Sequence, residues 1–171
     1  MNFNNIVGDA VGLVHLIASI IALVTGLMVL INRKGTRFHK RTGYVYAAAM
    51  LVLNATAFMI YRLYGSFGIF HWFAVFSCLT LLAGLYPVLT KRSKNYLLLH
   101  FSFMYWSVIG LYCAFMAEVF TRLPSIVLTA SGEPMTIFYK MVGIAIAVTM
   151  TVGIIFFRKH SPKWTKQYQR R

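Results

Sequence analysis

Acidic residues are almost absent from this chain: Asp9, Glu118 and Glu133 are the only three among its 171 residues. Charged residues of both signs make up 12% of the sequence, about half the share found in a soluble domain. At the same time 59% of the residues are hydrophobic, more apolar surface than a core of this size can hide. The composition therefore excludes an ordinary soluble domain and indicates a membrane protein.

Cysteine is equally scarce, with Cys78 and Cys113 as the only two. Both fall inside apolar runs, where a thiol acts as a small packing residue. They exclude a disulfide framework and indicate no redox compartment. The first ten residues carry no cation ahead of the first apolar run, which argues against a cleaved signal peptide. We therefore expect the first helix to remain in the mature protein.

Positive charge, in contrast, is abundant, with a formal net charge of +14. A protein that binds nucleic acid would spread such charge over one face. Here the cations form short clusters between long apolar runs, which is the pattern of a membrane protein. We expect no nucleic-acid partner.

Five apolar runs are each close to the roughly 20 residues that a helix needs to cross a bilayer. The runs are continuous and do not alternate as the strands of a membrane barrel would. We predict an all-α polytopic membrane protein in which four helices form an up-down bundle and a fifth lies at its periphery. The spans form one domain, residues 1–157, and cover about residues 10–31, 43–61, 69–90, 96–120 and 136–157.

The distribution of the cations predicts the orientation. Fourteen of the seventeen Lys and Arg residues fall in the loops after the first and third spans and in the tail, residues 158–171. Short basic loops stay in the cytoplasm, so we predict an outside N-terminus and a cytoplasmic C-terminus. The tail mixes cations with Trp164 and Tyr168, as expected of a segment that lies on anionic lipid headgroups, and its His160 is interpreted as an ordinary interfacial residue.

The other four histidines fall one on each of the first four helices. With a rise of about 1.5 Å per residue, His15 and His71 both lie about 27–30 Å from the inner boundary, near the outer surface. His39 and His100 lie about 33–35 Å from the outer boundary, near the inner surface. Counted from Lys94 instead, His100 lies a turn or more deeper than His39. In an up-down bundle each pair stands on diagonal helices, where a planar ligand can be held between them.

His39 follows a candidate N-cap, Thr36, in the stretch NRKGTRFHKRTGYVY. The positive end of the helix dipole and five nearby cations both disfavour the imidazolium form. We expect His39 to be neutral, the form that binds a metal. The alternative is an interfacial histidine beside the charges that orient the protein. The cations nearest to it that suit the propionates of a porphyrin are Arg37, Lys40 and Arg41.

The same stretch resembles an uncharacterised family of bacterial membrane proteins, the domain of unknown function 2306. The resemblance covers about residues 10 to 120 and includes the histidines of the third and fourth helices. It implies a multi-pass protein of the bacterial inner membrane and supplies no activity. Lys40 stands where the family commonly shows arginine. The most specific pattern consists of Lys34, Gly35, Thr36, His39, Lys40, Gly43 and Tyr46.

The layout of helices and histidines also looks distantly similar to the cytochrome b561-type proteins, which hold two b hemes by histidine pairs on alternate helices. No local motif supports that kinship, so it is an analogy of architecture. It suggests a membrane b-type cytochrome with an outer heme on His15 and His71 and an inner heme on His39 and His100. Such a protein would carry electrons across the bilayer from a quinol or a membrane redox partner.

Two further hypotheses stay open. Glu118 is expected about 6 Å below the outer edge, at the depth of His15 and His71. Two histidines and a carboxylate can bind Zn, Fe or Cu, in a hydrolase or in an assembly factor for an oxidase. An ion pair between Glu118 and Arg122 is the simpler reading of that carboxylate. The chain could also be a structural or transport subunit, and whether it is an enzyme or a homo-oligomer stays open.

Overall fold

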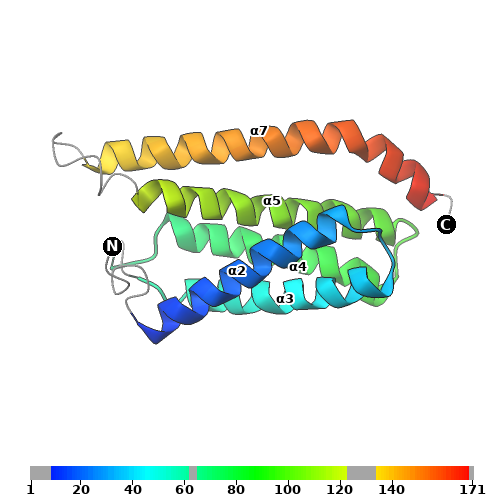
Figure 1. The fold of residues 1–171 in the computed structure, drawn as a ribbon, viewed down its shortest axis with the longest axis horizontal. Coiled ribbons are helices and arrows are strands. Elements are labelled where there is room, and N and C mark those ends of the chain that lie inside the picture. The colour runs from blue at the N-terminus through cyan, green and yellow to red at the C-terminus, as the bar shows by residue number, and fades with distance from the viewer. Residues whose placement is uncertain (1–8, 62–64, 123–133, 170–171) are drawn as a thin grey trace.

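The computed structural model describes residues 9–61, 65–122 and 134–169, and within these ranges it contains five helices (Figure 1). The predicted all-α fold is confirmed. Four of the helices are long and apolar enough to cross a membrane, so the chain is a polytopic membrane protein. In chain order the helices are α2 (Ala10–Ile31), α3 (Arg37–Ala57), α4 (Ile69–Thr90), α5 (Tyr96–Arg122) and α7 (Pro134–Gln169).

The helix outside that set of four is α3, which starts and ends earlier than the predicted span at 43–61. Its first residue is Arg37, because the Thr36 hydroxyl caps the helix by accepting the backbone N–H of His39 at 3.1 Å. Its last residue is Ala57, followed by Phe58 as the C-cap. The cations of the first turn lower its mean hydropathy, and its apolar part measures only about 22 Å.

The first four helices form a ring in which neighbours in the chain are neighbours in space. α2 packs on α3, α3 on α4, α4 on α5, and α5 closes the ring on α2. α2 and α4 are therefore diagonal to each other, as are α3 and α5. α7 packs along the outside of α5 (Figure 1). We call the end at which α3 and α5 begin the basic end, because the basic turns before these two helices lie there.

Small residues let α2 approach α3 closely. Ala18, Ala22 and Gly26 follow one another on the buried face of α2 at helical spacing. A Cβ atom on Gly26 would lie 3.0 Å from the ring of Tyr46, a tight contact that the ring would have to relieve by a small shift. Small residues at this spacing are a common device for packing helices within a membrane.

Tyrosine hydroxyls connect α5 to three other helices. The Tyr46 hydroxyl forms a 2.9 Å hydrogen bond with the Ser107 hydroxyl and thereby links α3 to its diagonal partner α5. The Tyr105 hydroxyl donates to the carbonyl of Gly153 on α7 at 2.8 Å, and the Tyr112 hydroxyl donates to that of Leu23 on α2 at 3.2 Å. These bonds fix the positions of α2, α3 and α7 along α5.

Removing the hydroxyl of Tyr46 is expected to destabilise the protein. Tyr46→Phe loses the buried bond and leaves Ser107, which is 2% exposed, without this partner. Hydrogen bonds between membrane helices contribute about 1 kcal/mol, so we expect a loss of that size in the free energy of unfolding in detergent. Tyr44→Phe is the matched control, since Tyr44 is 70% exposed. Equal stability of the two variants would contradict the role of the bond.

The last helix continues well past the apolar run predicted to end at residue 157. α7 remains helical through Pro162 to Gln169, so the described part of the basic tail is an extension of the helix. Trp164 from this extension packs on Phe101 of α5, with ring centroids 4.5 Å apart, and His160 stacks on Phe156 at 4.1 Å. The extension therefore covers the basic end of α5.

Candidate ligand-binding site at the basic end

His39 and His100 lie at the same level on the diagonal helices α3 and α5. Both helices start at the basic end and run in the same direction (Figure 1). Tyr46 and Ser107, which are hydrogen-bonded, are 61 residues apart, and His39 and His100 are 61 residues apart as well. Each histidine therefore precedes its member of that hydrogen-bonded pair by seven residues, about 10.5 Å. The sequence left open whether His39 and His100 lie at the same level, and in the structure they do.

Hydrogen bonding to the backbone fixes the proton position on His100. Its Nδ1 lies 2.7 Å from the carbonyl oxygen of Gly84 on α4. A carbonyl can only accept, so Nδ1 carries the hydrogen, and Nε2 of the neutral ring has the lone pair. Histidines that bind metals usually donate their other N–H to a carbonyl or carboxylate in this way. Gly84 permits the contact, since a Cβ atom there would lie 2.7 Å from the sulfur of Met104.

His39 lies in the first turn of α3, before the predicted span begins at Gly43. Burial, together with the smaller effects of Lys34 and His100, lowers the pKa of its imidazole from 6.5 to about 4. The expected neutral imidazole is thus supported, with burial as the largest cause and the neighbouring charge second. Its Nδ1 is buried and has no hydrogen-bond partner in the structure. One turn further along α3, a Cβ atom on Gly43 would meet no atom within 4 Å.

The stability of the protein is expected to fall in acid because of His39. Its pKa is below the ordinary value in the folded state, so the unfolded chain binds the proton first as the pH drops from 6.5 toward 4. The midpoint of thermal unfolding should decrease over this window and be constant above it. His39→Gln removes the group and should flatten that part of the profile. An unchanged slope in the variant would contradict the assignment.

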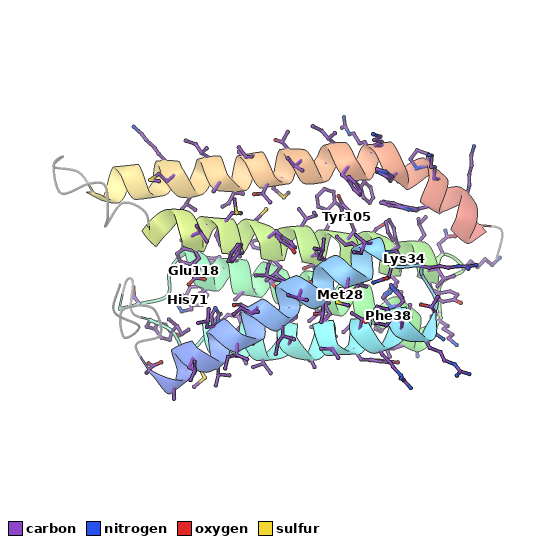
Figure 2. The ribbon with its side chains drawn as sticks, viewed as in Figure 1. Met28, Lys34, Phe38, His71, Tyr105 and Glu118 are labelled. Atoms are coloured by element: carbon purple, nitrogen blue, oxygen red, sulfur yellow. The ribbon has the colours of Figure 1, made fainter. Side chains whose placement is uncertain are left out.

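Several cations lie at the basic end, and Lys34 is the one that acts on His39. The ammonium group of Lys34 donates to the carbonyls of Val29 and Leu30 at 2.5 and 2.6 Å and so caps the end of α2. Burial lowers the pKa of Lys34 from 10.5 to about 8. The other cations predicted to pair with propionates, Arg37, Lys40 and Arg41, are exposed on the first turns of α3. Figure 2 shows Lys34 at this end of the bundle.

The second histidine pair, His15 and His71, also lies at one level, near the opposite end. His15 Nδ1 is 2.9 Å from the Thr56 hydroxyl, which lies ten residues after Tyr46 and is thus level with Ala117 of α5. Gly84 of α4 meets α5 at Met104. Counted from this contact, His71 on α4 and Ala117 on α5 are both thirteen residues away, so they lie at the same level. His15 and His71 therefore lie at the same level, as the sequence predicts.

The hydrogen bonds of His71 differ from those of a metal ligand. Its Nδ1 accepts the backbone N–H of Gly68 at 3.0 Å, so the side chain caps the start of α4. A neutral imidazole that accepts on Nδ1 carries its hydrogen on Nε2, which leaves no lone pair there for a metal. Nε2 is buried and has no partner in the structure. The His71 ring stacks on Phe67 at 4.8 Å and contacts the tilted ring of Tyr61 at 4.6 Å.

The structure does not assemble the hypothetical set of His15, His71 and Glu118. Within residues 9–61, 65–122 and 134–169, no group of three or more His, Cys, Asp or Glu side chains is placed to hold a metal ion. Figure 2 shows His71 and Glu118 toward the same end of the bundle. The alternative ion pair with Arg122 falls on a side chain outside the described residues.

The family model for a predicted membrane protein, DUF2306, matches residues 12–158. The chain belongs to the DUF2306 family. The match covers all four helices of the ring and most of α7, so this DUF2306 protein has the candidate site inside the family region. No curated protein and no solved structure matches it.

Two features of the site in this DUF2306 protein were not found from the sequence. The carbonyl of Gly84 cannot be identified as a partner of His100 by any local pattern, because 16 residues and a turn separate them. Thr56 is equally distant from His15 along the chain. Pro87 was the nearest signal in the sequence, since it lacks the N–H that would bond the carbonyl of Ala83, one residue before Gly84.

Proposed function

We propose that this DUF2306 protein is a membrane electron carrier that holds a b-type heme between His39 and His100 at the basic end of the bundle. We place this end at the cytoplasmic face of a bacterial inner membrane, with the N-terminus outside, because Lys and Arg accumulate in short cytoplasmic loops. Anionic lipid headgroups at that face would contact the tail.

The proposal rests on one observation: two neutral imidazoles lie at the same level on diagonal helices. The lone pair of His100 Nε2 is left available because Nδ1 donates to Gly84 at 2.7 Å. His39 has a pKa of about 4 and stays neutral at physiological pH. Two neutral imidazoles could hold the iron of a b-type heme between them.

The surroundings fit a porphyrin in two respects. The open space at Gly43 lies on the His39 face of α3, one turn from the ligand position. Further in, Tyr46 and Ser107 join the two helices at 2.9 Å and close the interior, so a planar group is confined to the region next to the basic end. Exposed cations on α3 suit the two propionates.

The heme, when bound, supplies one-electron redox chemistry. The residues of the chain then have separate tasks. His39 and His100 would hold the iron, and the Gly84 carbonyl orients His100 by accepting its Nδ1–H at 2.7 Å. We do not extend the proposal to a heme on His15 and His71, because His71 has its hydrogen on Nε2 in this geometry.

The test is an absorption spectrum of the protein purified in detergent after expression with added heme precursor, together with elemental analysis of the same sample. A Soret band of a six-coordinate, low-spin heme at about one per chain supports the proposal. A heme-free protein, or stoichiometric metal without a porphyrin, refutes it. The second result would instead support a metal site.

A further inference from the structure

We propose that the interior of the bundle near its opposite end binds the carbonyl oxygen of a membrane-soluble quinone, through hydrogen bonds from Asn54 on α3 and His71 on α4. This site is separate from the histidine pair at the basic end and does not depend on a bound heme. It rests on two buried donors and on the aromatic side chains around them.

Both donors are buried and lack partners. Asn54 is 5% exposed and His71 is 4% exposed, and neither Asn54 Nδ2 nor His71 Nε2 has a hydrogen-bond partner in the structure. The Nε2 atom is a donor because Nδ1 accepts the N–H of Gly68. A buried donor without a partner destabilises the folded protein, because it has lost its hydrogen bonds to water. An acceptor bound between the two helices would satisfy both donors.

The two donors lie at nearly the same level of adjacent helices. Asn54 follows Tyr46 by eight residues and is level with Phe115 of α5, eight residues after Ser107. Gly84 of α4 lies against Met104 of α5, so positions on the two helices can be counted from this contact. Toward the opposite end, Phe115 is eleven residues from Met104 and His71 is thirteen residues from Gly84. The difference of two residues corresponds to about 3 Å along the bundle. Since α3 packs on α4, one oxygen atom between them can accept from both side chains.

The surface beside His71 suits a planar apolar ring. Tyr61 is 44%, Phe67 49% and Trp72 55% exposed, and all three lie beside His71 in the chain or in contact with its ring. Phe67 stacks on the His71 ring and lies outside the helices, between Gly65 and Gly68, where the chain can move more easily than in a helix. A quinone arriving from the lipid would displace Phe67 and bring its carbonyl to the two donors. A second carbonyl-bearing source, the ester of a lipid, lacks the ring that these aromatic faces would stack on.

The experiment is a titration of the full-length protein in detergent with a short-chain benzoquinone or naphthoquinone. Quenching of tryptophan fluorescence is the readout, because Trp72 is next to His71 and packs edge-on against Phe67 at 5.4 Å. We expect saturable quenching in the wild-type protein that is lost in Trp72→Phe. Asn54→Leu and His71→Phe should each weaken binding about tenfold, as expected for one lost hydrogen bond.

Stability separates a binding role from a folding role. Asn54→Leu replaces an unpaired polar group by an apolar one of similar size, which should leave the ligand-free protein as stable as before or more stable. Asn95→Leu, at an exposed asparagine toward the basic end, is the matched control and should bind the quinone normally. Equal quenching in all variants, or quenching that rises linearly with quinone, overturns the proposal and assigns the donors to buried water.

The outcome is independent of the heme test. His100→Phe should leave the quenching by quinone unchanged. A protein without a Soret band that binds quinone through Asn54 refutes the proposed function and keeps this site. A protein that binds heme but no quinone supports the proposed function and refutes the quinone site.

Discussion

His100→Ala is expected to abolish heme binding by the protein, with the heme content falling from about one per chain to near zero. The substitution removes an axial ligand and leaves the Gly84 carbonyl without the Nδ1–H that it accepts at 2.7 Å. The measurement is the Soret absorbance per protein after purification in detergent. His39→Ala should give the same loss, since the two ligands act on one iron.

Two other histidines serve as controls for this experiment. His160 lies on the extension of α7, where its Nδ1 is 2.9 Å from the carbonyl of Phe156. His71 caps α4 at the opposite end. His160→Ala and His71→Phe should both retain the Soret band of the wild type. If His71→Phe loses it and His100→Ala keeps it, the heme belongs to the outer pair and the assignment made here is wrong.

The second large effect is expected at Gly84. A Cβ atom there would lie 2.7 Å from the sulfur and 3.2 Å from the backbone nitrogen of Met104, so Gly84→Ala forces α4 away from α5. Overpacking of this kind costs about 1–3 kcal/mol. The shift also moves the carbonyl that orients His100, and loss of such an outer contact weakens metal binding by about 10–100-fold. Unfolding in detergent and heme titration measure the two effects.

Gly110 provides the matched substitution. It lies on α5, and a Cβ atom on it would meet nothing within 4 Å. Gly110→Ala should therefore stabilise the helix by about 0.5–1 kcal/mol through the loss of backbone freedom in the unfolded chain, with no change in heme affinity. A Gly84→Ala protein as stable as Gly110→Ala would show that α4 and α5 do not approach as closely as described.

Part of the site could be predicted from the sequence because it depends on local order along the chain. The capping of α3 by Thr36 is a local pattern, and the predicted bond to His39 is present at 3.1 Å. The levels of the histidines follow from the constant rise of a helix, and the outer pair lies at matching levels as predicted. The start of α3 was predicted by its cap, while its end at Ala57 was not.

Other parts depend on neighbours that the sequence does not indicate. The sequence explained the neutrality of His39 by the dipole and the cations, and the structure shows burial as the larger cause. The sequence does not indicate which ring nitrogen of His71 carries the hydrogen. In the structure Nδ1 accepts the Gly68 N–H, so the hydrogen is on Nε2. Asn54 is buried inside the bundle, and its Nδ2 has no hydrogen-bond partner in the structure.

The sequence by itself determined that this is a polytopic membrane protein built of helices, because apolar length and charge distribution act through the bilayer, whatever the packing. Membership of the DUF2306 family was likewise evident from a short basic motif and is confirmed over residues 12–158. Only the tertiary structure decided which nitrogen of each histidine carries the hydrogen, because that depends on atoms supplied by other segments at distances near 3 Å.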